Sequence, residues 1–297
     1  MSSTGVSSVL TRIARRIKRR LQPPIPEHGV HAIQVDGLVL HLDLAQHTHR
    51  RIALRRDFEP ELTTALARCV HAGDVVADIG SNFGWHSLQL AKNVPRVHKI
   101  YAFEPGAVAH GLFTRNLEIN AGLSDRIQLQ KMAIGAEPGE VTLRQFAGLG
   151  TVNASIYPLG DLEYTGEAVP VRPLDALVLE MDSAPAVIKC DVEGAERDVL
   201  SGCRKLLGGE LGEPPMWFLE ANYETSGMAG YFPWQLVDAA AAHAPYVGYV
   251  LRDGTVTSMR TRTSLRHGET LVLAVEEVHK GRLQALGSSR GSSGGTA

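Results

Sequence analysis

Short apolar runs alternate with amphipathic stretches through most of the chain. The apolar runs predict strands at 75–80, 99–105, 127–135, 186–192 and 216–221. Stretches with helical periodicity follow them, at 84–92, 107–120, 194–206 and 233–243. Strands that alternate with helices predict a mainly parallel sheet with helices on both faces, which is the α/β fold class.

Other patterns add elements around this unit. Two alternating runs within 31–44 flank Asp36-Gly37, which predicts a hairpin, and 58–71 predicts a helix with Pro60 in its first turn. Further strands are expected at 139–146, 169–174, 246–254 and 269–276.

The chain divides into three parts by its pattern. Apolar residues recur at helical spacing within 9–21, with basic residues between them, so 1–27 is expected to be a basic amphipathic segment. That helix either makes weak contact with an anionic membrane surface or packs on the protein. The main domain is expected at 28–279, and 280–297 has the composition of a disordered tail.

Composition narrows the class of protein. Of the 297 residues, 44% are apolar and 21% charged, which is ordinary globular usage. The net charge is −2, but six basic residues and no acid lie in 1–26, so the remainder is acidic. An acidic body argues against nucleic acid as a partner. The three cysteines lack a C-x-x-C pair, and no secretory signal precedes the domain, so we expect a cytoplasmic protein.

A glycine turn joins the first strand of the main unit to its helix. The pattern is D-x-G-x-N-x-G over 78–84, so the middle glycine of a dinucleotide fingerprint is replaced by Asn82. Asp78 would repel a pyrophosphate but suits an ammonium or a sulfonium, and S-adenosyl-L-methionine carries both. The alternative is a purely structural turn with a capping aspartate.

Glu104 lies at the end of the second strand of this unit. A carboxylate at that strand end can accept hydrogen bonds from both ribose hydroxyls of an adenosine. A nicotinamide dinucleotide would use the same contact, so Asp78 and Asn82 decide in favour of the sulfonium cofactor.

An acidic loop follows the run at 186–192. Asp191, Glu193 and Glu196 lie within six residues, and the next strand adds Glu220 and Asn222 at the same edge of the sheet. Ligands of open α/β sheets bind beyond the carboxyl ends of the strands, where Asp191 and Glu193 are expected. Glu196 fits simple capping of the following helix.

The segments DIGSNFGWHSL, YAFEP and VIKCDVEGAERDVLSG, in this order, resemble the FkbM family of S-adenosylmethionine-dependent methyltransferases. FEPE at 58–61 and VPVRPLDAL at 169–177 also match, and the resemblance covers about 30–275. It implies a Rossmann-like class I methyltransferase fold with a seven-stranded sheet, its last strand antiparallel, plus an N-terminal hairpin and helix. It also implies O-methylation of hydroxyls on sugars, polyketides or other secondary metabolites.

The resemblance assigns roles to residues of this chain. The cofactor-binding residues would be Asp78, Gly80, Ser81, Asn82, Phe83, Gly84, Glu104, Pro105, Ala133, Ile134 and Asp191. Within this set the glycine turn would hold the methionine part, Glu104 the ribose, and Ala133 with Ile134 the adenine. Asp191, Glu193 and Glu220 would face a small, hydroxyl-bearing acceptor.

The expected reaction is in-line methyl transfer to a hydroxyl, with Asp191 or Glu193 as the base. His86 is a second candidate base, although a helix histidine there also fits a packing role. No metal is assigned, but Mg²⁺ on Asp191, Glu193 and Glu220 is an alternative. The acceptor pocket is expected from 147–168 and 223–232. Two other functions stay open: a nicotinamide-dependent oxidoreductase, and a non-catalytic cofactor-binding protein at a membrane surface.

Overall fold

The computed structural model describes residues 26–146, 154–158 and 161–287. The expected amphipathic segment and its membrane contact at 9–21 therefore lie outside the described residues. Within them, no helix is long and apolar enough to span a bilayer.

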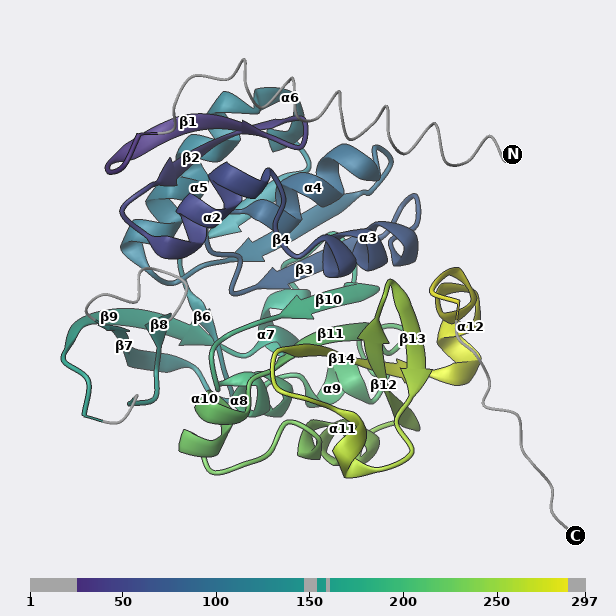
Figure 1. Cartoon of the computed structure of the whole chain (residues 1–297). Helices are drawn as coiled ribbons and strands as arrows, with labels where there is room; N and C mark the ends of the chain where they lie inside the picture. Colours follow the sequence, from purple (N-terminus) through teal and green to yellow (C-terminus); the bar gives the residue numbers. More distant parts are fainter. Residues whose placement is uncertain (1–25, 147–153, 159–160, 288–297) are drawn as a thin grey trace, which may run out of the picture.

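One large sheet forms the centre of the molecule (Figure 1), with the strand order β13-β12-β14-β11-β10-β3-β4-β5. Its strands are β3 (Val75–Ile79), β4 (Lys99–Phe103), β5 (Ile127–Gln130), β10 (Val187–Cys190), β11 (Met216–Ala221), β12 (Tyr246–Arg252), β13 (Thr255–Ser258) and β14 (Glu269–Val275). β5, β4, β3, β10 and β11 are mutually parallel, and β14 runs antiparallel between β11 and β12. The order of the strands along the chain reverses between β3 and β10, which is where α/β sheets bind ligands.

The α/β, Rossmann-like class is confirmed, but the predicted number of seven strands is wrong. The main sheet has an eighth strand, β13, because the chain turns back after β12 at Asp253-Gly254. Both residues have positive φ (49° and 72°), the geometry of a tight hairpin turn. The short run after this turn forms the additional strand.

Helices cover both faces of the sheet (Figure 1). On one face lie α2 (His47–Arg55), α3 (Pro60–Cys69), α4 (Trp85–Asn93), α5 (Ala107–Ile119), α6 (Ala121–Ser124) and α12 (Glu276–Ala285). The other face carries α7 (Leu174–Val178), α8 (Glu196–Ser201), α9 (Arg204–Leu207), α10 (Tyr223–Met228) and α11 (Gln235–Ala241). A 3₁₀ turn, η2 (Arg262–Ser264), precedes β14.

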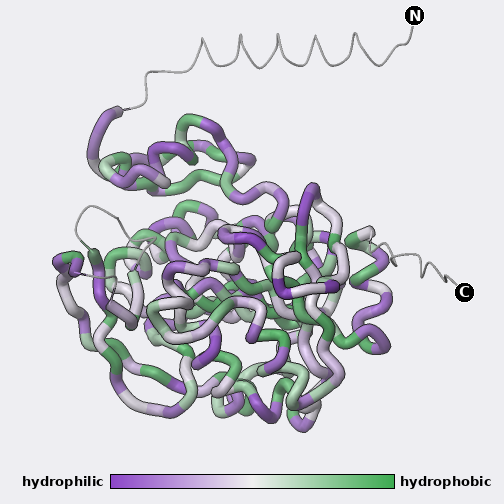
Figure 2. The backbone as a smooth tube through the Cα atoms, turned by 60° about the horizontal axis from the view of Figure 1, so that its bottom comes forward, coloured by the Kyte–Doolittle hydropathy of each residue, from purple (hydrophilic) through white to green (hydrophobic). Residues whose placement is uncertain are grey.

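The strands are buried on both faces, so successive side chains enter two different cores. On β3, Val76 packs with the α3–α5 side, whereas Val75, Ala77 and Ile79 pack with the α7–α11 side. Figure 2 shows hydrophobic stretches running through the middle of the molecule and hydrophilic ones along its outer turns. Polar residues within these strands are therefore exceptional and indicate a function or a buried ion pair.

The N-terminal additions are confirmed. β1 (Val30–Val35) and β2 (Leu38–Asp43) pair as the predicted hairpin, and Pro60 is the first residue of α3. The helix α2 was not predicted, because its charged residues mask an apolar face that buries His49, Ile52 and Ala53.

A second, four-stranded sheet, with order β6-β9-β7-β8, lies beside the main one. It comprises β6 (Ala133–Ile134), β7 (Gly139–Phe146), β8 (Ala154–Ser155) and β9 (Tyr164–Arg172). The strands predicted at 139–146 and 169–174 are confirmed as β7 and the end of β9, which pair with each other antiparallel. The predicted strand 127–135 is divided, because its last part leaves β4 and pairs with β9 instead.

The predicted boundary of the tail at 280 is too early. Helix α12 continues to Ala285 and buries His279 and Leu283 on one side, followed by Leu286. This spacing of three and four residues is the apolar stripe of a packed helix. Residues 288–297 lie outside the described part.

Candidate active site

Two cavities lie at the carboxyl ends of the parallel strands, and Asp191 lines both. The first, of about 310 Å³, extends over β3 and β4 toward the small sheet. The second, of about 440 Å³, lies between the start of α3 and the ends of β10, β11 and β12. Asp191 directly follows β10, the strand beside the reversal of strand order.

The glycine turn forms the base of the first cavity. Gly80 has a φ of +72°, and a Cβ atom there would lie 1.9 Å from the carbonyl oxygen of Asp191. Asn82 also adopts a left-handed conformation, with a φ of 50°. The turn is thus pressed against the loop that carries Asp191, and only glycine fits at its closest point.

Glu104 is the buried acid of the first cavity. Its Oε2 accepts a hydrogen bond from the backbone N–H of Asn82 and its Oε1 one from Gly106, both at 2.8 Å. Burial raises the pKa of Glu104 to about 7, although the two backbone hydrogen bonds oppose this shift. The carboxyl group is therefore fixed in place, and each oxygen keeps a lone pair for a ligand.

Most of the predicted cofactor residues surround this cavity. Its walls include Gly80, Asn82, Glu104, Pro105, Ala133, Ile134 and Asp191. The small sheet closes the side opposite the turn with residues such as Val141 and Leu143. The predicted residues Asp78, Ser81, Phe83 and Gly84 do not line it. Phe83 packs instead in the core against the ring of His49, at 4.8 Å.

Asp78 is buried beneath the turn and is paired with Lys189. The two residues are register partners on β3 and β10, so their side chains point to the same face of the sheet. The Lys189 Nζ lies 3.5 Å from Asp78 Oδ1 and donates to the carbonyl oxygen of Gly80 at 2.7 Å. Ser87 donates to Asp78 Oδ2 at 2.6 Å. The described partner of Asp78 is thus a lysine of the protein itself.

Lys189 was missed by the sequence reasoning. Its Nζ also lies 3.5 Å from Asp191 Oδ2, so one buried ammonium links the glycine turn to the acidic loop. Burial alone lowers the pKa of Lys189, but the charges of Asp191, Asp78 and Glu59 outweigh it and raise the pKa. A lysine inside the otherwise apolar run 186–190 was the signal in the sequence.

Asp191, Glu193 and Glu220 converge where the two cavities meet. One carboxylate oxygen from each lies within 4.8 Å of the others. Asn222 donates to Glu193 Oε2 at 3.1 Å, and burial together with the neighbouring acids raises the pKa of Glu193 to about 9. The pKa of Glu220 is raised well above its ordinary value, first by burial and then by Asp191 and Glu193.

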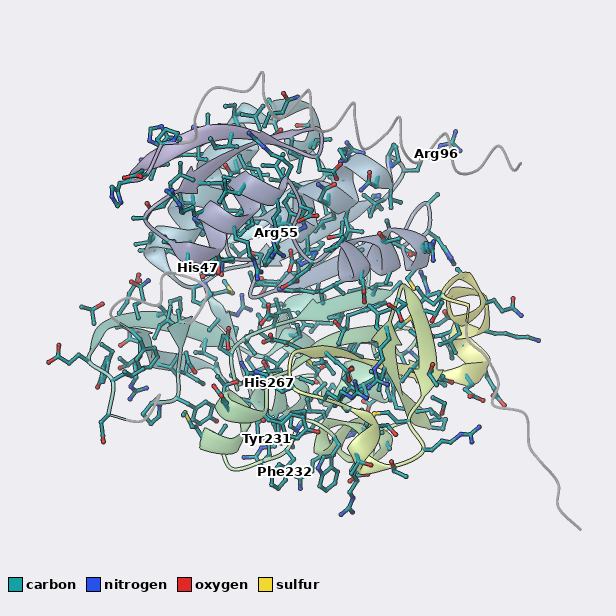
Figure 3. The ribbon with its side chains drawn as sticks, viewed as in Figure 1. His47, Arg55, Arg96, Tyr231, Phe232 and His267 are labelled. Atoms are coloured by element: carbon teal, nitrogen blue, oxygen red, sulfur yellow. The ribbon has the colours of Figure 1, made fainter. Side chains whose placement is uncertain are left out.

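Glu196 forms hydrogen bonds within the acidic loop and holds its backbone in place. Its Oε1 accepts hydrogen bonds from the backbone N–H groups of Val192 and Gly194, and its Oε2 accepts one from the Tyr231 hydroxyl at 2.5 Å. In Figure 3 the labelled Tyr231 lies near α10. The labelled His47 marks the start of α2, which lies on the opposite face of the sheet. Glu196 lies in the first turn of α8, as expected, but it makes no capping hydrogen bond to that helix; its oxygens bond to the preceding loop and to Tyr231 instead.

His86 is held behind the wall of the second cavity. Its Nε2 lies 2.9 Å from Glu59 Oε2, and the buried ring lines neither cavity. Glu59, in contrast, lines the second cavity; burial opposes its ionisation, but His86 and Lys189 lower its pKa. The packing interpretation fits this placement better than that of a catalytic base. Glu59 was missed as a site residue, although FEPE was noted as a motif.

The second cavity does not use the segments expected to form the acceptor pocket. It is lined by 59–62, 189–191, 218–220, 251–253 and 268–270. Of the insert 147–168, Ala154 and Ile156 line the first cavity, because the described strand β8 belongs to the small sheet that covers this cavity. Residues 147–153 and 159–160 lie outside the described part, and 223–232 lines neither cavity.

These features define an α/β protein with two ligand cavities meeting at one acidic loop. The family model of the methyltransferase FkbM domain matches residues 78–228, which include the glycine turn, Glu104 and the acidic loop. The match covers half of the chain, and the chain belongs to the FkbM methyltransferase family.

Individual proteins resemble the chain more distantly. Methyltransferase sdnD of Sordaria araneosa is 26% identical over 162 residues, which are 43% of this chain and 59% of that protein. Methyltransferase 1 of Beauveria bassiana (strain ARSEF 2860) is 30% identical over 145 residues, 43% of this chain and 57% of that protein. The chain thus spans less than two thirds of each relative. The crystal structure of methyltransferase FkbM from Methylobacillus flagellatus KT has 18% identity and a TM-score of 0.46, covering 69% of this chain and 44% of that one.

Proposed function

We propose that the protein transfers a methyl group from S-adenosyl-L-methionine to a hydroxyl group of a small molecule. The observation that carries this proposal is the meeting of two cavities of different chemistry at one carboxylate, Asp191. Family membership supplies the type of reaction. The division into two cavities supplies separate places for a donor and an acceptor.

The first cavity fits the donor. Glu104 would accept hydrogen bonds from the ribose hydroxyls, and Ala133 and Ile134 offer small apolar surfaces to the adenine. The described lining contains no lysine or arginine but includes the acids Glu104, Glu137, Glu140, Asp191, Glu193 and Asp198. Acids without a basic residue suit a cationic ligand and disfavour a pyrophosphate. When bound, the cofactor supplies a methyl group on a positively charged sulfur.

The second cavity is proposed to hold the acceptor. Asp191 is the proposed base, because it alone of the three converging acids lines both cavities. Glu193 lines only the first and Glu220 only the second. A carboxylate at the junction can take the proton of a hydroxyl as that hydroxyl attacks, and it can orient the hydroxyl beforehand.

In this proposal Asp78 acts through Lys189. The ion pair fixes the carbonyl of Gly80 on one side and the carboxylate of Asp191 on the other. This differs from the direct contact between Asp78 and the cofactor that the sequence pattern predicts. Lys189 is accordingly a positioning residue for both cavities.

Calorimetry with the full chain tests the donor assignment. S-adenosylhomocysteine, the demethylated cofactor, should bind with a stoichiometry of one, and NAD⁺ should give no heat of binding. Binding of NAD⁺ with no response to S-adenosylhomocysteine would favour the oxidoreductase alternative and contradict the proposal.

The acceptor requires a second experiment. Cell extract incubated with the protein and methyl-labelled S-adenosylmethionine should yield a labelled small molecule, detected by mass spectrometry. Base treatment that hydrolyses methyl esters should leave the label in place if the new bond is an ether. Label found only in protein, in nucleic acid or in base-labile esters would contradict O-methylation of a small-molecule hydroxyl.

A further inference from the structure

The junction of the two cavities concentrates negative charge. Oxygens of Asp191, Glu193 and Glu220 come within 4.8 Å of one another, although the residues belong to two different segments. Three carboxylates at this separation repel one another strongly when ionised, and the repulsion grows as water is excluded. Such a cluster is stable as a set of ionised groups only with a cation among its oxygens.

Glu220 shows that one partner of the cluster is missing. It makes no hydrogen bond within the described residues, and its Oε2 is completely buried. The acids of the acidic loop do have partners: Asn222 for Glu193, Lys189 for Asp191, and Tyr231 for Glu196. A buried carboxylate oxygen without a partner is costly, so native proteins satisfy nearly all such atoms with a protein group, a water or an ion.

Lys189 does not fill this gap. Its ammonium group is shared between Asp78 and Asp191, and it donates to the carbonyl oxygen of Gly80. No ion pair joins Lys189 to Glu193 or Glu220 in the described structure. Its close contacts are therefore with Asp78, Gly80 and Asp191, and neither glutamate has an ion-pair partner in the described structure.

We propose that Asp191, Glu193 and Glu220 together bind one divalent cation of the magnesium class. Carboxylate oxygens are the ligands that such hard cations prefer, and three of them leave further coordination positions for water or a ligand hydroxyl. The cation would lie at the junction, between the first cavity, which Glu193 lines, and the second, which Glu220 lines. Binding of the cation is independent of the methyl donor. The role of the cation in orienting the acceptor hydroxyl, in contrast, rests on the proposed function.

Manganese(II) is the probe, because its electron paramagnetic resonance signal distinguishes free from bound ions. The full chain, without any methyl donor, should bind one Mn²⁺, and added Mg²⁺ should release it by competition. The variant Glu220→Gln keeps the shape of the side chain but removes one charged ligand, so the affinity should fall about tenfold or more.

Glu61→Gln is the matched control. Glu61 lines the same second cavity but does not belong to the converging cluster, and it is exposed on α3. If the cavity attracts cations only through its overall negative charge, Glu220→Gln and Glu61→Gln should weaken Mn²⁺ binding equally. That result would reject the proposed cation site. Absence of Mn²⁺ binding to the unmodified chain at about 1 mM would reject it as well.

Three further measurements make the result unambiguous. Thermal unfolding should show that Glu220→Gln folds as well as the unmodified chain, since it removes a buried charge without a partner. Glu193→Gln provides an independent ligand variant with the same expected loss of Mn²⁺ affinity. S-adenosylhomocysteine binding is measured in parallel: if it binds while Mn²⁺ does not, only the cation site is wrong, and the reverse result contradicts only the proposed donor.

Discussion

The two cavities beside Asp191 are built from the same sheet edge but in different ways. The first is lined mainly by apolar side chains and by the backbone of the glycine turn, and its fixed polar group is Glu104. In the second, about half of the lining residues are charged, and both basic ones are ion-paired: Lys189 with Asp191, and Arg252 with Glu269. One cavity is therefore shaped by packing and the other by electrostatics.

On the proposed function, this difference would separate recognition of the donor from recognition of the acceptor. The apolar part of the first wall selects a ligand by shape, and its acids, above all Glu104, add a preference for a cationic or hydroxyl-bearing ligand. In a wall of paired charges, a charged side chain can exchange its partner for a polar ligand, so such a wall can hold different polar ligands. The stability of the wall depends on each ion pair, because a buried charge that loses its partner is costly. The two walls meet at the Asp78–Lys189–Asp191 group, so removal of the lysine that joins them should affect both.

The largest expected effect comes from Lys189→Met. Removing the buried ammonium leaves Asp78 and Asp191 without their cation, so the free energy of unfolding should fall by about 3–5 kcal/mol. Urea unfolding followed by circular dichroism measures this loss. Lys131→Met is the control: it breaks the exposed pair with Glu167, which should contribute less than about 1 kcal/mol. Equal losses in the two variants would show that the buried pair does not support the site.

Asp191→Asn should separate catalysis from donor binding. The amide keeps the shape of the junction but cannot accept a proton, so the rate of methyl transfer should fall by about 100-fold or more. Affinity for S-adenosylhomocysteine, measured by calorimetry, should stay close to that of the unmodified chain. Asp238→Asn, on the exposed side of α11, controls for the chemical change itself. A rate that is unaffected by Asp191→Asn would remove this residue from the role of base.

Gly80→Ala should damage the first cavity through the backbone. The added Cβ would overlap the carbonyl of Asp191, and the residue has a φ of +72°, so stability should fall by about 2 kcal/mol or more together with donor binding. Gly111→Ala in α5 is the matched control, because nothing lies within 4 Å of the new methyl group. That change should stabilise the protein by about 0.5–1 kcal/mol. Melting temperatures of both variants test the contrast.

The smallest effect concerns pH and is confined to the first cavity. Because the pKa of Glu104 is raised to about 7, the free protein holds this carboxyl protonated below that pH and ionised above it. The ionised form accepts two ribose hydroxyls better, so affinity for S-adenosylhomocysteine should rise about tenfold between pH 6 and pH 8. Glu104→Gln should bind more weakly and lose this dependence. A dependence of the same steepness in the variant would assign the titration to another group.

Local patterns determined much of the fold and part of the site. The alternation of apolar runs and helices, the Asp36-Gly37 hairpin and the helix that begins at Pro60 all follow from neighbouring residues, and the structure confirms them. The glycine turn and Glu104 were also recognisable from the sequence, because each depends on a strand end that the apolar pattern marks. β13 was missed although Asp253-Gly254 is a strong turn signal, since the run after it is short and mainly polar.

Contacts between distant segments had to come from the tertiary structure. The pairing of Asp78 with Lys189 depends on the register of β3 against β10, and that of His86 with Glu59 on how α3 packs beside α4. Neither follows from spacing along the chain, because a shift of one residue in register would turn a side chain to the other face of the sheet. Sequence alone identified Glu104 and the three converging acids but missed Glu59, whereas packing decided which of these acids are paired with groups of the protein and which remain open to a ligand.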